Sequence, residues 1–175
     1  IMTTKLLDPD RLFPTDPSQK GIARSLYEGI KDLPIVSPHG HTDPAWFAEN
    51  KCFTDATSLL LIPDHYLFRM LYSQGISLEN LGIPRMDGGR VETDMRKIWH
   101  MFAANYHLFR GTPSSIWMDH VFYEIFRLTE LFSTATADAF YDHINAQLQT
   151  DAYRPRALLD RFNIEVIATT EGAVD

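Results

Sequence analysis

The chain has 175 residues, of which 45% are apolar and 22% are charged, and its formal net charge is −7. This is the composition of a globular protein with a sizeable core, and the acidic balance argues against a nucleic-acid partner because phosphate binding needs a basic surface. No apolar run approaches the ~18 residues of a membrane helix. The single cysteine, Cys52, excludes an internal disulfide and predicts a reducing, cytoplasmic compartment.

The first predicted elements are a helix and a strand. A helix is expected from about 17 to 31, because Asp16 suits the N-cap position and Pro17 the first helical position, and apolar residues then recur at helical spacing. The short run Leu-Pro-Ile-Val that follows is partly β-branched. It predicts a buried strand at about 34–39.

A long helical block is expected from about 44 to 153. Capping residues and glycines divide it into separate helices, and the clearest of these signals are Asp64, Gly75, either Thr93 or Asp94, Gly111, Thr112 and Thr136. A short helix near 155–161 and a second strand at about 163–169 complete the order. Two strands with helices between them predict a parallel pair joined by a crossover. Because two strands do not make a stable sheet, the chain is expected to be the front part of a longer α/β domain.

Two histidines lie one residue apart where the first strand ends. Side chains at positions i and i+2 of an extended chain project to the same side, so His39 and His41 can reach one cation. Seven histidines give by chance about a quarter of an expected His-x-His pair, so the motif alone is weak. Its place at the C-terminal end of a strand, where α/β folds carry their sites, strengthens it. Asp43 is positioned to add an oxygen or to orient a histidine.

Three segments together resemble the uronate isomerase (glucuronate isomerase) family of the amidohydrolase superfamily. The first is I-V-S-P-H-G-H-T-D-P at 35–44, similar to the His-x-His of the family's first strand. The second is P-D-H-Y-L-F-R-M at 63–70, similar to the family's Asp-His-Tyr-x-x-Arg. The third is F-N-I-E-V-I-A-T-T-E-G-A-V-D at 162–175, similar to its second strand and the Thr-Thr that follows.

The resemblance implies a fold and an activity. The fold is the N-terminal part of a distorted (β/α)8 TIM barrel, with residues 1–175 forming part of one domain and 44–153 inserted between strands 1 and 2. The activity is aldose–ketose isomerisation of hexuronates, D-glucuronate with D-fructuronate and D-galacturonate with D-tagaturonate, in hexuronate catabolism. A cytoplasmic homo-oligomer without nucleic-acid or membrane partners is expected.

The resemblance also implies roles for individual residues. His39 and His41 are the expected ligands of a divalent metal, zinc above all, with Asp43 outside the first ligand shell. Tyr66 is the expected catalytic residue. It is expected to bind the hexuronate together with His65 and Arg69.

Other interpretations of the same residues stay open. Without the resemblance, Tyr66 reads as an aromatic residue at the edge of the core and Arg69 as a structural or solvated arginine. Arg110-Gly111-Thr112 reads as a helix stop and restart rather than an anion site. The chain could also belong to a metal-dependent hydrolase of the same superfamily, or be a non-catalytic helical interaction domain. Alone, it is expected to have little or no activity and to expose apolar surface.

Overall fold

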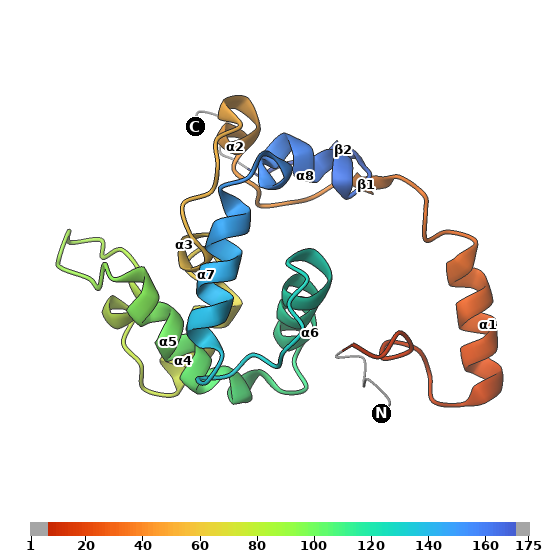
Figure 1. Cartoon of the computed structure of the whole chain (residues 1–175), viewed down its shortest axis with the longest axis horizontal. Helices are drawn as coiled ribbons and strands as arrows, with labels where there is room; N and C mark the ends of the chain where they lie inside the picture. Colours follow the sequence, from red (N-terminus) through yellow and green to blue (C-terminus); the bar gives the residue numbers. More distant parts are fainter. Residues whose placement is uncertain (1–6, 171–175) are drawn as a thin grey trace. The chain divides into compact units, whose positions relative to one another are not determined.

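The computed structural model describes residues 7–170, and the chain divides into two compact units. The helical unit spans 53–150. The strand unit combines residues 8–52 with the described residues from 151 to 170. Figure 1 labels the α-helices and strands of both, and each unit is described by itself below.

The strand unit contains short helices and two strands. Its elements are α1 (Pro17–Glu28), β1 (Ile35–Ser37), α2 (Pro44–Glu49), the 3₁₀-turn η4 (Asp151–Tyr153), α8 (Pro155–Arg161) and β2 (Ile164–Ile167). The Asp16 side chain accepts a bond from the Gln19 amide, so α1 begins where the sequence predicts. The predicted order of helix, strand, short helix and strand is therefore present.

The two strands pair in parallel, as expected. Ile35 is opposite Ile164 and Ser37 is opposite Ile167, with a register shift after Ile35. Backbone bonds close the pair at both ends: the Ile35 amide donates to the Asn163 carbonyl at 2.8 Å, and the Ala168 amide donates to the Ser37 carbonyl at 2.9 Å. The carboxyl ends of the strands therefore lie at the same edge.

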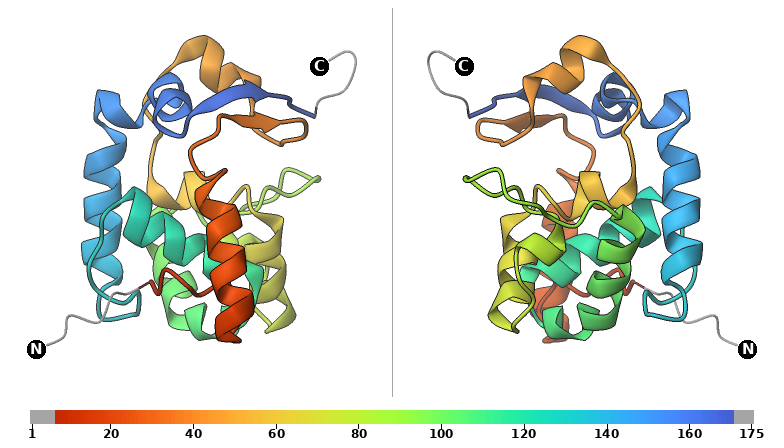
Figure 2. Two further views of the ribbon diagram at one scale, coloured as in Figure 1. Left: turned by 90° about the vertical axis from the view of Figure 1, so that its right-hand side faces the viewer. Right: turned by 90° about the vertical axis from the view of Figure 1, so that its left-hand side faces the viewer.

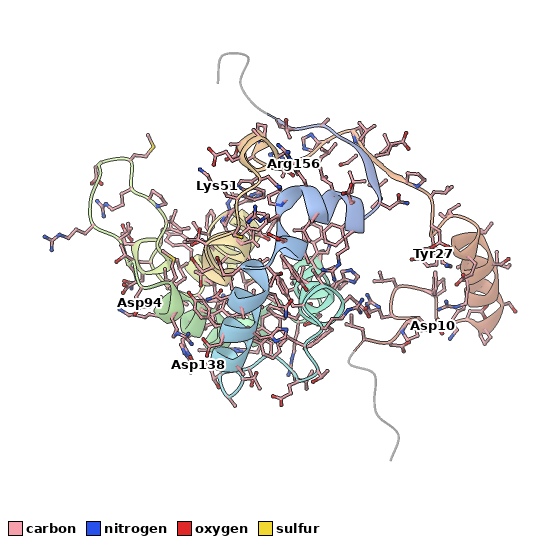
Figure 3. The ribbon with its side chains drawn as sticks, turned by 45° about the horizontal axis from the view of Figure 1, so that its top comes forward. Asp10, Tyr27, Lys51, Asp94, Asp138 and Arg156 are labelled. Atoms are coloured by element: carbon pink, nitrogen blue, oxygen red, sulfur yellow. The ribbon has the colours of Figure 1, made fainter. Side chains whose placement is uncertain are left out.

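Arg156 joins α8 to the end of α2 (Figure 3). Its Nε donates to the Phe47 carbonyl at 2.8 Å and its Nη2 to the Ala48 carbonyl at 3.1 Å, and its own amide donates to Asn50 Oδ1 at 3.0 Å. The last carbonyls of a helix have no partner within the helix, so these bonds satisfy groups that α2 leaves open. They tie residues 47–50 to the helix that leads into β2.

The expectation that the first strand is buried is wrong for the described chain. Ile35 is 48% exposed and Val36 is 60% exposed. Within residues 7–170, β2 is the only strand paired with β1. Two short strands and α8 offer too little surface to cover these side chains, so the apolar run forms a strand without being enclosed.

The helical unit packs its helices around aromatic side chains. Its elements are α3 (Ala56–Leu60), α4 (His65–Ser73), the 3₁₀-turns η1 (Glu79–Leu81) and η2 (Tyr106–Phe109), α5 (Met95–Asn105), α6 (Pro113–His120), the π-helical turn η3 (Val121–Ile125) and α7 (Ala137–Leu148). Residues 84–92 form an extended loop beside these helices (Figure 2).

Phe132 lies at the centre of the aromatic core. Its ring centroid is 4.8 Å from that of Phe122, 5.1 Å from that of Phe140 and 5.2 Å from that of Trp99. Trp99 is fully buried, and its indole Nε1 donates to the Ala137 carbonyl at 2.9 Å. Aromatic burial and this satisfied polar group together hold α5 against α7.

An ion-pair cluster bridges the exposed side of α5 and α7. Arg96 donates to Asp138 at 2.7 Å and also contacts Asp142, while His100 Nε2 lies 3.0 Å from Asp138. Asp138 is labelled in Figure 3. Hydrogen bonds from Arg96 and then from His100 lower the pKa of Asp138 below its usual range. Exposed pairs of this kind contribute little to stability. The packing of α5 against α7 is therefore stabilised mainly by the aromatic core.

The segment after α6 departs from a regular helix. The sequence predicts one helix whose apolar face runs on to Phe126, whereas the chain widens into a π-helical turn over Val121–Ile125. The Phe126 amide donates to the Val121 carbonyl at 3.0 Å, and Arg127 then takes a left-handed conformation with φ 58°. The wider turn ends the helix and directs residues 127–136 back over the core.

Candidate active site

The structure brings the rings of His39 and His41 together beyond the end of β1. Their Nε2 atoms are 3.2 Å apart, and their ring centroids are 4.9 Å apart with an interplanar angle of 85°. Both residues are exposed. The alternation of an extended chain therefore places both imidazoles on the same side, as the spacing predicts.

The backbone at Gly40 allows this arrangement. A Cβ atom at Gly40 would lie 3.0 Å from the Ala168 carbonyl oxygen, closer than an ordinary contact. Ser37 Oγ donates to the His39 carbonyl at 3.0 Å, and Thr170 Oγ1 lies 3.4 Å from His39 Nδ1. Residues from the ends of both strands thus position His39.

The spacing of the two Nε2 atoms fits a shared metal ion. Two nitrogens bound at about 2.0–2.1 Å to a tetrahedral zinc ion lie about 3.3–3.4 Å apart, and the observed separation is 3.2 Å. One N–H···N hydrogen bond between neutral rings has a similar length. Among residues 7–170, no group of three or more His, Cys, Asp or Glu side chains is arranged to hold a metal. The described donor set is therefore this pair of imidazoles.

Asp43 caps a helix. Its Oδ1 accepts a bond from the Ala45 amide at 2.8 Å, and Pro44 occupies the first position of α2. The sequence suggests Asp43 as a support for the histidines. In the structure, one of its two carboxylate oxygens accepts the hydrogen bond that caps α2.

In the helical unit, α4 carries the Asp-His-Tyr-x-x-Arg residues. Asp64 Oδ1 accepts bonds from the Tyr66 amide at 2.8 Å and the Leu67 amide at 3.3 Å, so it fixes the first turn. Leu67 is fully buried. Burial of this side of α4 leaves His65, Tyr66 and Arg69 exposed.

His65 and Tyr66 lie closer together than their helical positions suggest. Adjacent residues project about 100° apart around a helix, yet the two ring centroids are 4.2 Å apart at an interplanar angle of 35°. The side chains turn toward one another at the first turn of α4. An imidazole and a phenol are thus offered side by side, with Arg69 one turn further on.

The helical unit also contains a cavity with polar and apolar walls that the sequence analysis did not find. Its volume is about 470 Å³, and its walls include Tyr106, Arg110, Ser115 and Asp119. The available signal was the spacing of Ser115 and Asp119, which places both on one face of a helix. The structure confirms Gly111 and Thr112 as the stop and restart: Gly111 has φ 74°, and Thr112 caps α6.

Comparison with known proteins identifies the family. The sequence model of the glucuronate isomerase family matches residues 17–175. A uronate isomerase of Xanthomonas euvesicatoria pv. vesicatoria (strain 85-10) is 61% identical over 169 residues, which cover 97% of this chain and 36% of that protein. A uronate isomerase of Mesorhizobium japonicum is 59% identical over 170 residues, which cover 97% of this chain and 36% of that protein.

Two solved structures share the fold of the described chain. The crystal structure of glucuronate isomerase from Caulobacter crescentus has a TM-score of 0.91 and 57% identity, covering 96% of this chain and 35% of that one. The crystal structure of uronate isomerase from Thermotoga maritima has a TM-score of 0.79 and 27% identity, covering 94% of this chain and 33% of that one. The chain therefore spans about a third of the length of these relatives.

These findings define an α/β protein whose first strand leads into a pair of histidines. The chain belongs to the glucuronate isomerase family. The family inferred from the three sequence segments is thus confirmed, although residues 171–175 of the third segment lie outside the described part. No helix within the described residues is long and apolar enough to cross a membrane.

Proposed function

We propose that the protein carrying this chain interconverts the aldose and ketose forms of hexuronates. The pairs are D-glucuronate with D-fructuronate and D-galacturonate with D-tagaturonate, in hexuronate catabolism. Membership of the family and relatives that are named uronate isomerases support this assignment. The observation that carries it is the 3.2 Å separation of the His39 and His41 Nε2 atoms beyond the carboxyl end of β1.

His39 and His41 are the proposed ligands of a divalent metal ion, with zinc as the first candidate. The two Nε2 atoms have the spacing of neighbouring tetrahedral ligands. A neutral imidazole that binds through Nε2 carries its proton on Nδ1, and Thr170 Oγ1 is placed to accept it from His39. When bound, the metal supplies positive charge that stabilises an enediolate.

The proposed substrate-binding residues are His65, Tyr66 and Arg69. Isomerisation removes a proton from C2 of the sugar and delivers one to C1, so it needs a group that can move a proton. The exposed phenol of Tyr66 is the candidate, and His65 beside it can bond to a sugar hydroxyl. Arg69 can pair with the hexuronate carboxylate through two parallel N–H bonds. Asp43 keeps an outer role through its position between the histidines and α2.

The proposed architecture is a distorted (β/α)8 barrel of the amidohydrolase superfamily. Parallel pairing of β1 with β2 across a long helical connection supports it, because successive barrel strands pair in this way. Residues 1–175 then contribute the first two strands and the helical insertion to one barrel domain. A cytoplasmic homo-oligomer is proposed as well. The apolar residues of β1 are about half exposed, which supports the proposal that other parts of the protein or another subunit pack against this sheet.

A metal-dependent hydrolase is the second candidate. Paired imidazoles also suit activation of water on a metal, so the histidines alone do not separate the two reactions. The Asp-His-Tyr-x-x-Arg residues on α4 favour the isomerase, because they present an imidazole, a phenol and a guanidinium on one exposed side. Parallel assays of glucuronate isomerisation and of ester and amide hydrolysis distinguish them.

The test combines metal uptake with activity. Equilibrium dialysis against Zn²⁺ is expected to show uptake by the wild type and at least a tenfold loss in His39→Ala and His41→Ala, because each variant removes one of two ligands. The matched control is His120→Ala, which removes an exposed histidine from the end of α6. Equal zinc uptake in all four proteins would remove the metal site from the proposal.

Activity is measured on the same set of variants. In the full-length protein that carries this chain, isomerisation of D-glucuronate should be lost with zinc in both histidine variants and kept in His120→Ala. The chain 1–175 alone is expected to have little or no activity, since it spans about a third of the relatives' length. Hydrolysis without isomerisation by the wild type would favour the second candidate.

A further inference from the structure

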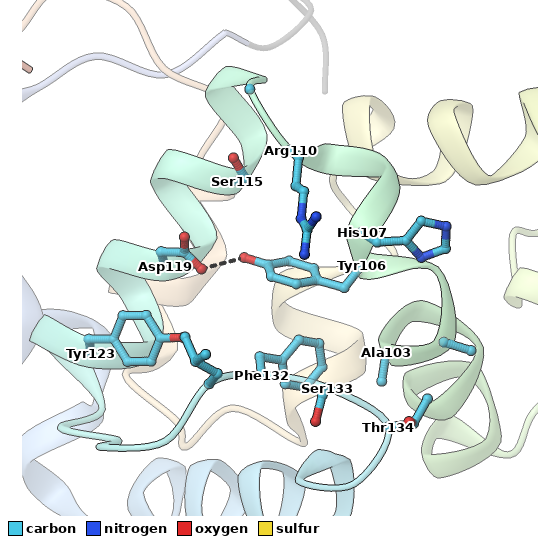
Figure 4. Close-up of a pocket in the computed structure, with 13 residues that line it drawn as sticks. Ala103, Tyr106, His107, Arg110, Ser115, Asp119, Tyr123, Phe132, Ser133 and Thr134 are labelled. Carbon is cyan, nitrogen blue, oxygen red and sulfur yellow. Dashed lines mark hydrogen bonds between the residues drawn. The ribbon is translucent and has the colours of Figure 1, made fainter. Parts of the chain in front are cut away.

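Two helical stripes face each other across the cavity in the helical unit (Figure 4). One stripe comes from the end of α5, from η2 and from Arg110 directly after it, and the other from α6 and the π-helical turn. Their members recur three or four residues apart, so each set lies on one face. The first stripe contains Ala103, Tyr106, His107 and Arg110, and the second contains Ser115, Asp119 and Tyr123.

A partly buried hydrogen bond connects the two stripes. Tyr106 Oη donates to Asp119 Oδ1 at 2.7 Å. Burial, and then the adjacent Asp119 carboxylate, raise the pKa of Tyr106 far above its usual range, so the phenol stays neutral and remains a donor. Asp119 is thereby held in a fixed orientation against the cavity.

The cavity carries opposite charges on its two walls. Figure 4 shows the Arg110 side chain extending toward the Tyr106 ring, with Asp119 at the hydroxyl end of that ring. An arginine binds a carboxylate through two parallel bonds. An ionised aspartate accepts up to about four hydrogen bonds, so Asp119 can serve a ligand hydroxyl as well as Tyr106.

The remaining lining includes hydroxyl groups, aromatic rings and aliphatic side chains. Ser115 and Ser133 contribute hydroxyl groups, and Phe132 and Tyr123 contribute ring surface. A volume of about 470 Å³ lies within the roughly 300–1,000 Å³ of small-molecule sites. The π-helical turn that supplies Tyr123 is an irregularity that often accompanies functional sites.

We propose that this cavity binds a small carboxylate that carries several hydroxyl groups. Arg110 holds the carboxylate, while Ser115 and Asp119 bond to the hydroxyls. The aromatic side chains cover the apolar face of the ligand. This site lies wholly within the helical unit and does not depend on the proposed isomerase reaction, because none of His39, His41, His65, Tyr66 and Arg69 lines the cavity.

The test uses three ligands that separate the required groups. D-Gluconate has both the carboxylate and the hydroxyls, D-glucose lacks the carboxylate, and acetate lacks the hydroxyls. Each is titrated into the ¹⁵N-labelled chain while amide chemical shifts are followed. Gluconate is expected to shift amides in 103–134, with an affinity at least tenfold above those of glucose and acetate. Equal responses to the three ligands, or no response in 103–134, would overturn the proposal.

Two variants test the assigned contacts. Arg110→Gln removes the guanidinium and is expected to weaken gluconate binding at least tenfold. Arg110→Lys keeps the charge but not the paired bonds, so its affinity for gluconate should lie between those of the wild type and Arg110→Gln. The control is Arg90→Gln, because Arg90 is exposed and does not line the cavity. Arg110→Gln binding gluconate as tightly as the wild type would contradict the assignment, provided that its spectrum shows a folded chain.

The pattern of shifts also separates this site from the proposed active site. Shifts confined to 39–41 or 64–69 would support ligand binding at the proposed active site and count against the cavity. Shifts in 103–134 that persist in His39→Ala would support the cavity whatever the outcome of the isomerase assay.

Discussion

At the scale of single residues, Gly40 sets the spacing of the histidine pair. Its backbone passes so close to the end of β2 that an added Cβ would lie 3.0 Å from the Ala168 carbonyl oxygen. The contact is with backbone, which cannot turn aside as a side chain can. Gly40 therefore permits two things at once: the ends of β1 and β2 lie close together, and the rings of His39 and His41 lie close together.

Gly40→Ala is expected to weaken zinc binding roughly tenfold and to lower the free energy of unfolding by about 1 kcal/mol, because Ala168 must shift. The matched control is Gly21→Ala in α1, where an added Cβ meets nothing within 4 Å. Alanine there should stabilise the helix by about 0.5–1 kcal/mol. Zinc dialysis and urea unfolding measure both effects. Unchanged zinc uptake in Gly40→Ala would show that the strand contact does not position the histidines.

Tyr106 makes the stability of the helical unit sensitive to alkaline pH. Burial raises the pKa of Tyr106 in the folded state above the usual 10.0. The unfolded tyrosine ionises from about pH 10 upward while the folded one does not. Its contribution to stability is therefore complete below about pH 10 and declines as the pH rises above it.

Tyr106→Phe should lower the free energy of unfolding at pH 8 by about 1.5–3 kcal/mol, because the bond to a carboxylate is lost. It should also flatten the decline in stability between about pH 9.5 and 11. Tyr72→Phe is the control, since Tyr72 is 58% exposed. Urea unfolding at both ends of this range is the measurement. A decline as steep in Tyr106→Phe as in the wild type would assign the alkaline sensitivity to other groups.

At the scale of elements, capping determines where α4 presents its polar residues. Asp64 accepts bonds from the amides of Tyr66 and Leu67. Loss of this cap would loosen the turn that carries His65 and Tyr66.

Asp64→Ala is expected to cost about 1 kcal/mol of stability, whereas Asp64→Asn should cost a few tenths because asparagine caps as well as aspartate. Thermal unfolding compares the two. The proposed role of His65 and Tyr66 is tested in the full-length protein that carries this chain, where the KM for D-glucuronate should rise in Asp64→Ala and not in Asp64→Asn. Equal stability of the two variants would mean that the α4 cap contributes little.

Helix starts were the elements that the sequence predicted best. Asp16, Asp64 and Asp94 all accept bonds from the amides of the first helical turn. The same signal is present at Asp43-Pro44, which matches Asp16-Pro17 and begins α2. Thr136 differs, because α7 begins after it without a side-chain cap bond; a capping residue in the sequence therefore predicts the start of a helix better than it predicts the bond.

The π-helical turn and the burial of the strands were harder to predict. The run Val-Phe-Tyr-Glu-Ile-Phe at 121–126 has the apolar spacing of an ordinary α-helix, so nothing local marks the wider turn. Burial of β1 depends on what packs against it, which its own sequence does not show. In the site, the spacing predicted the approach of His39 to His41, while the approach of His65 to Tyr66 depends on rotamers.

At the scale of the whole molecule, the buried side chains are unevenly distributed. Nearly all of the buried apolar residues among the described residues lie in the helical unit, with five in α7 alone. Within the described chain, α1 buries none of its side chains. Local stability follows buried contacts, so the two units should differ widely in protection.

Hydrogen exchange is expected to show the slowest amides in α5 and α7, and amides in α1 that exchange at least roughly 100-fold faster. Mass spectrometry of peptides from each helix gives this comparison. Phe140→Ala should cost about 3–5 kcal/mol and speed exchange throughout α5 and α7, because it opens a cavity in their shared core. Comparable protection of α1 and α7 in the wild type would show that α1 gains stability from contacts outside the described chain.

The pairing of β1 with β2 has a consequence for synthesis on the ribosome. Ile35 meets a partner, Ile164, that is translated about 130 residues later, which at about 5–20 residues per second is a delay of roughly 6–26 s. During that interval the nascent chain displays an apolar segment with unsatisfied amides and carbonyls, of the kind that chaperones recognise. The helices translated in between fold from local contacts and can form while the first strand waits.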